Sequence, residues 1–492
     1  MAAVTIDAPN FVSSNSFAKV ARYHALFLRD RGHQVRILAR CPERAPVAVC
    51  PPHQVARLDG LRTNTIDGTH LVYCGPGDLR SAPRSIFLVP FETATLRPGW
   101  SRHAQAVRHL ATHSHASRQA LLLAGVAPDK VSLIHHGFDP TLYYPGAEPL
   151  FPMDGAFTFL FIGHFNPRKG IDRLVRAFVD TFGRDDDVRL RIVTQPMFGQ
   201  GRPQARIAAL ASGSPVADRI DVRIQPFNAG IPEQEMARVY ASGHCLVFPS
   251  LGEGFGLPAL EARACGLEVI ATRCGGLVDF LNHCNAHLVD VEAMRPDPAC
   301  ESMNPVYRGL HFWVPSSTSL RQRMREVYEG ARKPGGVEGW TWDERLDPLA
   351  RLVERHGEAE VRRPPVRTPP APEPQPLGGH EVPTVWLCSF RRSGNHWLQQ
   401  LLARNFEGIR TTKAHVHATE VRSMMGPHDR LVYLVRDPKD VLASNYEWAR
   451  ESGEAHNDQR SWVIRPDTPS SFLRRPRRFC IGSTFERHQS PL

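Results

Sequence analysis

The sequence predicts an α/β protein with two doubly wound domains between residue 1 and about residue 355. Short apolar runs of strand length alternate there with helical patterns, which is typical of parallel sheets covered by helices. The order restarts at Phe157, after the connection Ala147–Asp154. We therefore expect one Rossmann-like domain over residues 1–150 and a second over residues 151–360.

The opening of each domain follows a strand–helix order. In the first domain we expect a strand at Val4–Ile6, a helix over Phe17–Asp30 and a second strand at Gln34–Leu38. Gly32 follows the helix, and glycine commonly ends helices because it accepts a positive φ. The second domain repeats this order between residues 157 and 182.

Composition narrows the classes of protein. Hydrophobic residues make up 42% and charged residues 22% of the 492, which excludes a fully disordered chain or a fibre. No run of about 18 apolar residues occurs, so a membrane-spanning helix is not expected. The net charge of +10 suits either polyanionic partners or a merely solvated basic surface. The 10 cysteines show no zinc-site spacing and the N-terminus no secretory pattern, so we expect a cytoplasmic protein.

A proline-rich stretch separates the last part of the chain. Residues 361–383 contain repeated prolines, which fix φ and remove backbone donors, so they predict an extended, semi-rigid linker. A strand-like run restarts a folded pattern at Thr384. We expect a further α/β domain over residues 384–492.

The strongest chemical signal is a glycine-rich turn between a buried strand and a helix. The strand Leu246–Phe248 runs into Gly254 and Gly256, and the helix begins near Pro258. Free backbone N–H groups at such a helix start form an anion site. Two carboxylates accompany this cradle, which suggests that one faces a sugar and the other holds ribose hydroxyls. A generic strand–turn–helix with chance glutamates is the alternative.

These two carboxylates, Glu253 and Glu261, have seven residues between them and resemble the E-x7-E motif of retaining glycosyltransferases, family 4 in particular. The resemblance implies a GT-B fold with a nucleotide-sugar donor between its two domains. It also implies that Glu253 contacts the donor sugar and Glu261 the ribose. The donor-side loops implied by the same resemblance contain Gly254, Phe255, Gly256, Leu257, Gly275 and Gly276.

A second loop, residues 161–172, resembles the basic loop of the same family. The resemblance implies that Arg168 and Lys169 neutralise the donor diphosphate, most of all as negative charge builds on the leaving oxygen. No metal is then expected, and no DxD-type carboxylate cluster stands out. Two solvated cations at a helix start are the alternative.

The first domain resembles the family more loosely. Phe91–Thr93 stands roughly where the family has its acceptor-side histidine, and His103, His113 and His115 are expected to be surface or capping residues. Trp340–Glu344 and the helix after it resemble the C-terminal helix that crosses back onto the first domain. The implied acceptor is a carbohydrate or lipid-linked molecule. Peripheral contact with an anionic membrane stays open, and no nucleic acid partner is expected.

The tail begins with a strand–loop–helix pattern at residues 385–398. It lacks the Lys-Ser/Thr ending of a nucleotide triphosphatase P-loop. It resembles instead the phosphosulfate loop of sulfotransferases that use 3'-phosphoadenylyl sulfate (PAPS), so we expect a P-loop-like α/β sulfotransferase-type module. The resemblance implies a cofactor-binding set of Arg392, Ser393, Gly394, Asn395 and Trp397.

Two further segments of the tail resemble the same family. In residues 431–446, Arg436 and Ser444 would hold the 3'-phosphate of PAPS. In the segment at Lys413, His415 would take the acceptor proton as general base, as a near-neutral imidazole can.

The sequence thus predicts a glycosyltransferase with an appended sulfotransferase-like module. Because the tail is shorter than a complete domain of that family, a glycosyltransferase with a vestigial tail is one alternative. A non-catalytic scaffold that binds carbohydrate or nucleotide is the other.

Overall fold

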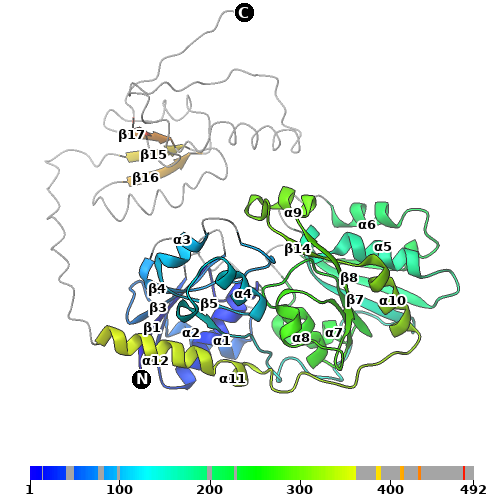
Figure 1. The fold of residues 1–492 in the computed structure, drawn as a ribbon, viewed down its shortest axis with the longest axis horizontal. Helices are drawn as coiled ribbons and strands as arrows, with labels where there is room; N and C mark the ends of the chain where they lie inside the picture. The colour runs from blue at the N-terminus through cyan, green and yellow to red at the C-terminus, as the bar shows by residue number, and fades with distance from the viewer. Residues whose placement is uncertain are drawn as a thin grey trace, which may run out of the picture. The chain divides into compact units, whose positions relative to one another are not determined.

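The computed structural model describes residues 1–13, 15–39, 49–75, 82–96, 100–196, 202–225, 230–361, 384–388, 410–414, 430–433 and 480–481. The chain divides into two compact units, Met1–Pro365 and Val366–Leu492 (Figure 1).

The first domain of the first unit is a parallel six-stranded sheet in the order β2-β1-β3-β4-β5-β6. Its strands are β1 (Ala3–Ala8), β2 (Gln34–Ala39), β3 (Thr69–Tyr73), β4 (Ala82–Leu88), β5 (Val107–Thr112) and β6 (Val131–Leu133). Its helices are α1 (Ser16–Asp30), α2 (Pro52–Asp59), α3 (Trp100–Gln105) and α4 (His115–Leu123), with a 3-10 turn η3 (Pro128–Lys130). The predicted opening strand, helix and second strand are all present.

Local chemistry sets the bounds of α1. The side chain of Asn15 accepts a hydrogen bond from the Ala18 N–H and so caps the helix start. Gly32, one residue beyond the C-cap Arg31, has a φ of 82°. This positive φ is the conformation predicted for the glycine that ends the helix.

The second domain is also a parallel six-stranded sheet, in the order β12-β11-β10-β7-β8-β9. Its strands are β7 (Phe157–Phe165), β8 (Val188–Pro196), β9 (Ile220–Ile224), β10 (Cys245–Phe248), β11 (Glu268–Thr272) and β12 (His287–Val289). The strands β7 and β10 are neighbours. Because both run in the same direction, the loops that follow them leave the sheet at the same edge.

Helices and short turns connect these strands. The helices are α5 (Ile171–Thr181), α6 (Pro203–Ala211), α7 (Met236–Tyr240), α8 (Leu257–Ala264), α9 (Pro298–Met303) and α10 (Ser317–Tyr328). The 3-10 turns are η4 (Pro167–Lys169), η5 (Ala217–Arg219), η6 (Glu233–Glu235), η7 (Gly275–Asp279) and η8 (Pro305–Tyr307), and an antiparallel pair is formed by β13 (Val291–Arg295) and β14 (Phe312–Pro315). The strands of both sheets are largely buried, as parallel sheets covered by helices require. The two sheets confirm the predicted α/β fold of the GT-B kind.

The chain returns to the first domain through α11 (Trp342–Arg345) and α12 (Asp347–Val361). The helix α12 packs against β3 and β6, and Figure 1 shows it lying along the first domain. Trp342 stacks on Tyr23 of α1 with ring centroids 4.8 Å apart. The expected crossing back onto the first domain is therefore present.

The second unit contains a sheet in the order β16-β15-β17-β18. Its strands are β15 (Thr384–Cys388), β16 (Arg410–Ala414), β17 (Arg430–Tyr433) and β18 (Cys480–Ile481). The strands β16, β15 and β17 are parallel, and β18 is antiparallel to β17. The first residue of the predicted linker, Val361, is the last residue of α12. The rest of the predicted linker, residues 362–383, lies outside the described residues. Over the part of the chain that the structure describes, no helix is both long and apolar enough to cross a membrane.

Candidate functional site

The glycine-rich turn predicted from the sequence lies at the carboxyl end of β10. Gly256 caps α8 with a φ of 106°, and Pro258 lies in the first turn of that helix. The turn contacts η7, because the Gly276 N–H donates to the Glu253 carbonyl over 2.9 Å. A Cβ on Gly276 would lie 2.4 Å from the Phe255 Cα, so only glycine allows this approach. The two loops predicted to bind the donor therefore pack directly on each other.

Glu253 is the centre of a buried cluster of charges. Its side chain is 6% exposed, and its Oε1 atom accepts from Lys169 Nζ over 2.7 Å and from Arg168 Nη1 over 3.1 Å. Ser250 Oγ donates to the same oxygen over 2.6 Å. One carboxylate oxygen thus collects two cations and a hydroxyl, and the predicted alternative of solvated cations does not hold.

The two cations are held in place by the turn η4, which follows β7. The side chain of Asn166 caps this turn by accepting from the Lys169 N–H over 3.0 Å. The Arg168 carbonyl accepts from the Leu251 N–H over 2.8 Å, and Arg168 Nη1 also donates to the Gly252 carbonyl. Backbone and side chain of Arg168 therefore join the loop after β7 to the loop after β10.

Burial and charge act in opposite directions on the pKa values in this cluster. Burial favours the neutral acid, yet the charges of Lys169 and Arg168 hold the pKa of Glu253 below its usual value. Burial, helped by the Arg168 charge, lowers the pKa of Lys169 despite its pairing with Glu253. Burial opposes the charge of Arg168 too, but Glu92 and Glu253 together raise its pKa. Glu253 is therefore ionised at neutral pH, and Lys169 releases its proton more easily than Arg168.

The first domain reaches this cluster through Glu92. Arg168 Nη2 lies 2.8 Å from Glu92 Oε1, and the Tyr307 hydroxyl donates to Glu92 Oε2 over 2.6 Å. Glu92 belongs to the segment interpreted above as the place of the acceptor-side histidine. Its side chain is 29% exposed, which makes it the accessible carboxylate of the group. The cluster is thus built from both domains.

Glu261 lies in a different buried network. Its Oε1 atom accepts from Lys19 Nζ over 2.8 Å, and its Oε2 atom accepts from the Tyr240 hydroxyl over 2.8 Å. Lys19 belongs to α1 of the first domain and also lies 3.2 Å from Glu233 Oε1. The pKa of Lys19 is raised, because attraction to Glu233 and Glu261 outweighs the opposing effect of burial. Glu261 therefore forms part of the contact between the domains.

The structure brings Glu253, Arg168 and Lys169 into direct contact and leaves Glu261 with other partners. Sequence analysis did not single out Lys19, Ser250 or Tyr240, which bond the two glutamates. Lys19 lies in the first turn of a helix, three residues before Arg22, and only its contact with α8 distinguishes it. The remaining predicted donor residues of this unit, Gly254, Phe255, Gly256, Leu257, Gly275 and Gly276, are all buried in the two touching loops. Their roles stay predictions.

The candidate residues of the tail, Arg392, Ser393, Gly394, Asn395, Trp397, His415, Arg436 and Ser444, lie outside the described residues. The strands that lead toward them are described. The strands β15, β16 and β17 are parallel neighbours, and the three candidate segments follow their carboxyl ends in the sequence. Carboxyl ends of parallel strands are where open α/β sheets bind ligands.

Comparison with known families gives one match in each unit. Residues 156–297 match the family model described as "Glycosyl transferases group 1". The second domain is similar to glycosyltransferases of group 1. Residues 402–489 match the model described as "Sulfotransferase domain". These matches support the glycosyltransferase and sulfotransferase resemblances at the level of domains.

Similar curated proteins include two glycosyltransferases from bacteria. D-inositol 3-phosphate glycosyltransferase 1 of Catenulispora acidiphila is 34% identical over 212 residues, 41% of this chain and 47% of the relative. D-inositol 3-phosphate glycosyltransferase of Acidothermus cellulolyticus is 34% identical over 171 residues, 33% of this chain and 37% of the relative. The chain therefore spans less than half the length of these relatives.

Solved structures to which this chain is similar include two enzymes. A glycosyltransferase from Rickettsia africae has a TM-score of 0.48 at 14% identity, covering 72% of this chain and 98% of its own. Sucrose-phosphate synthase from Thermosynechococcus elongatus has a TM-score of 0.46 at 16% identity, covering 73% of this chain and 96% of its own.

Proposed function

We propose that the first unit is a retaining glycosyltransferase of family 4 that uses a nucleotide-sugar donor. The observation that carries this proposal is the contact of Glu253 with Arg168 and Lys169, at the edge where parallel strands end. Two buried cations beside a carboxylate suit a diphosphate next to a sugar. The group 1 match over the same residues supports the assignment.

In the proposed reaction, the bond between the anomeric carbon and the diphosphate oxygen breaks. The acceptor oxygen bonds to that carbon on the same face, and its proton passes to the departing phosphate. Arg168 and Lys169 stabilise the charge that grows on the leaving oxygen. Glu253 orients the sugar while Glu261 exchanges Lys19 for the ribose hydroxyls. The residues supply the charge that a metal would otherwise bring, so the donor site requires none.

The acceptor is proposed to be a carbohydrate or a lipid-linked molecule. The similar curated proteins are named for D-inositol 3-phosphate, so this compound is the first acceptor to test. Glu92 is the partly exposed carboxylate that the first domain places beside Arg168. We assign it to the acceptor side of the site. A cytoplasmic location and peripheral membrane contact belong to the same proposal.

The second unit is proposed to transfer sulfate from PAPS. In that reaction the bond between sulfur and the phosphate oxygen of PAPS breaks, and an acceptor oxygen bonds to the sulfur. His415 would remove the acceptor proton, leaving adenosine 3',5'-bisphosphate as the product. The parallel arrangement of β15, β16 and β17 and the family match over residues 402–489 support this assignment.

To test the proposal for the first unit, the full chain is incubated with a panel of nucleotide sugars and D-inositol 3-phosphate. Release of nucleoside diphosphate and the anomeric form of the product are measured by NMR. We expect Glu253→Gln and Lys169→Ala each to lower kcat by about 100- to 1000-fold, the effect of removing one preorganised transition-state contact. Exposed counterparts, Glu329→Gln and Arg321→Ala, serve as controls and should turn over normally. Equal activity in all four variants would refute the assignment, and donor binding without turnover in the wild type would favour a scaffold.

The tail is tested separately by titrating the full chain with adenosine 3',5'-bisphosphate in a calorimeter. Saturable heat that is lost in Arg436→Ala supports the sulfotransferase assignment. Absence of heat in a chain that still turns over the sugar donor identifies a vestigial tail.

A further inference from the structure

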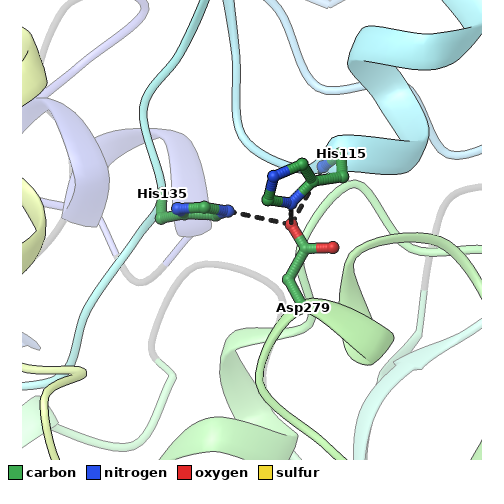
Figure 2. A group of neighbouring side chains, drawn as sticks. All are labelled: His115, His135 and Asp279. Atoms are coloured by element: carbon green, nitrogen blue, oxygen red, sulfur yellow. Dashed lines mark hydrogen bonds and ion pairs between the residues drawn. The ribbon is translucent and has the colours of Figure 1, made fainter.

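A second cluster of side chains joins the two domains of the first unit, and it shares no residue with the pairing of Glu253 and its cations. Figure 2 shows His115 and His135 pointing at the carboxylate of Asp279. His135 Nε2 lies 2.9 Å and His115 Nδ1 3.2 Å from the same oxygen, Asp279 Oδ2. The three ligand-type atoms lie within 4.8 Å of one another.

Each of the three residues is held by its own element. His115 is the first residue of α4, which Ser114 caps, and its backbone N–H donates to Asp279 Oδ2 over 2.9 Å. His135 follows β6 and packs edge-on against Trp340, with ring centroids 5.2 Å apart. Asp279 ends η7, and its side chain is only 3% exposed. The carboxylate and one imidazole are therefore fixed before any ligand binds.

The donor set has the chemistry of a transition-metal site. Two imidazole nitrogens and one carboxylate oxygen are ligands typical of Zn²⁺, whereas Mg²⁺ and Ca²⁺ prefer oxygen alone. The separations of 2.9 and 3.2 Å need to widen only slightly to admit an ion about 2.0–2.2 Å from each atom. The His115 side chain is 70% exposed, so it is free to adjust and leaves a route from solvent. Three protein ligands leave a fourth position for water.

Asp279 Oδ2 accepts from the His115 backbone N–H and lies within hydrogen-bond distance of both imidazole nitrogens. The hydrogen bond from the His115 backbone orients the carboxylate in the way that outer contacts orient metal ligands. The three residues belong to segments that lie far apart in the sequence. His135 and Asp279 are separated by 144 residues.

We propose that His115, His135 and Asp279 bind a divalent transition metal of the Zn²⁺ type and so clamp the first domain onto η7. The turn η7 also contains Gly276, whose N–H donates to the Glu253 carbonyl. The bound ion therefore fixes the loop that packs against the candidate donor site. This site is separate from sugar transfer, and the proposed function does not depend on it.

The test uses the full chain stripped of metal with a chelator and then titrated with Zn²⁺ in competition with a chromogenic chelator. Co²⁺ is titrated in parallel, because its visible absorption bands report tetrahedral nitrogen and oxygen ligands. We expect one equivalent to bind, at least tenfold more weakly in His115→Ala and Asp279→Asn. Mg²⁺ should not compete.

The matched control is His283→Ala, since His283 is an exposed histidine whose ring contacts Arg273 and not this cluster. It should bind the metal as the wild type does. The exposed His115 can be replaced without disturbing the core, so its variant separates loss of binding from loss of folding, checked by circular dichroism. Absence of a stoichiometric site in the wild type, or equal affinity in all variants, would overturn the proposal and leave a hydrogen-bonded contact between the domains.

Discussion

Replacing Glu253 by glutamine tests the charge cluster most directly. The substitution Glu253→Gln keeps the shape of the side chain and removes the charge that faces Lys169 and Arg168. Arg168 retains Glu92 as a partner. Among the described residues, Lys169 has no second carboxylate within ion-pair distance. The variant therefore leaves one buried ammonium group without a counterion.

The expected loss of stability follows from the deprotonation of Lys169. A buried, unpaired ammonium group releases its proton instead of staying charged. Releasing it at pH 7 from a group with an unfolded pKa of about 10.4 costs about 4.6 kcal/mol, at 1.36 kcal/mol per pH unit. This value is a ceiling, and it lies within the loss of about 3–5 kcal/mol that accompanies the breaking of a buried ion pair. We expect a loss of about 3–5 kcal/mol in the free energy of unfolding at pH 7.

The dependence on pH distinguishes this mechanism from simple repacking. In the variant, folded Lys169 is neutral while unfolded Lys169 is charged, so the unfolded state binds one more proton. Stability of the variant then rises by about 1.4 kcal/mol per pH unit until the unfolded pKa near 10.4 is reached. In the wild type burial lowers the pKa of Lys169 too, but pairing with Glu253 opposes this shift. The gap between the two proteins should shrink from pH 7 to pH 9.

The lowered pKa of Glu253 makes the free energy of unfolding of the wild type depend on pH in the acid range as well. The stabilisation from Glu253 is present above its unfolded pKa, near 4.5, and is lost as the pH falls through the lower folded value. Urea denaturation followed by circular dichroism at pH 3, 4, 5, 7, 8 and 9 measures the dependence on Glu253 at acid pH and the dependence on Lys169 at alkaline pH. Glu329→Gln is the control, because Glu329 is 63% exposed and lies 4.0 Å from its partner. A loss below about 1 kcal/mol, or one that stays constant with pH, would refute the reasoning.

Two further substitutions test the contact between the domains. Lys19→Met should lower the free energy of unfolding by about 3 kcal/mol, because Glu261 loses its buried cation. In a double-mutant cycle, Glu261→Gln should then cost less in the Lys19→Met background than in the wild type. Additive losses would contradict the ion pair. Gly252→Ala should destabilise the protein by at least about 1 kcal/mol, because its Cβ would lie 2.0 Å from the Glu92 carbonyl oxygen. Gly60→Ala meets nothing within 4 Å and should change the midpoint of urea denaturation little. Equal midpoints for both alanine variants would show that the domains separate without cost.

The proximity of Glu253 to Arg168 and Lys169 was predictable because it follows from sheet topology. The cations follow β7 and the carboxylate follows β10, and these parallel strands are neighbours. Each strand and helix involved has a local signature in the sequence, such as the proline at the start of α8. A pattern that fixes strand order therefore fixes which loops meet.

The contacts across the domains had no such signature. Lys19 and Glu261 are 242 residues apart, and His115 and Asp279 are 164 residues apart. Neither pair lies on neighbouring strands, so no periodicity or spacing relates one member to the other. Their contacts depend on how two separately formed sheets dock. Packing between domains is set by the whole surface of each domain, which short motifs do not encode.

The two glutamates therefore differ in what donor binding requires of the protein. Glu253 bonds Arg168 and Lys169 of its own domain, and Arg168 also bonds Glu92 of the first domain. Glu261 bonds Lys19 of α1, which belongs to the other domain. Under the proposed function, the ribose reaches Glu261 only when Lys19 releases it. A diphosphate that binds Lys169 then breaks a contact within one domain, whereas a ribose that binds Glu261 breaks a contact between the domains. Removing Lys19 separates these two steps, since it leaves the Tyr240 hydroxyl as the partner of Glu261 and does not alter the cations beside Glu253.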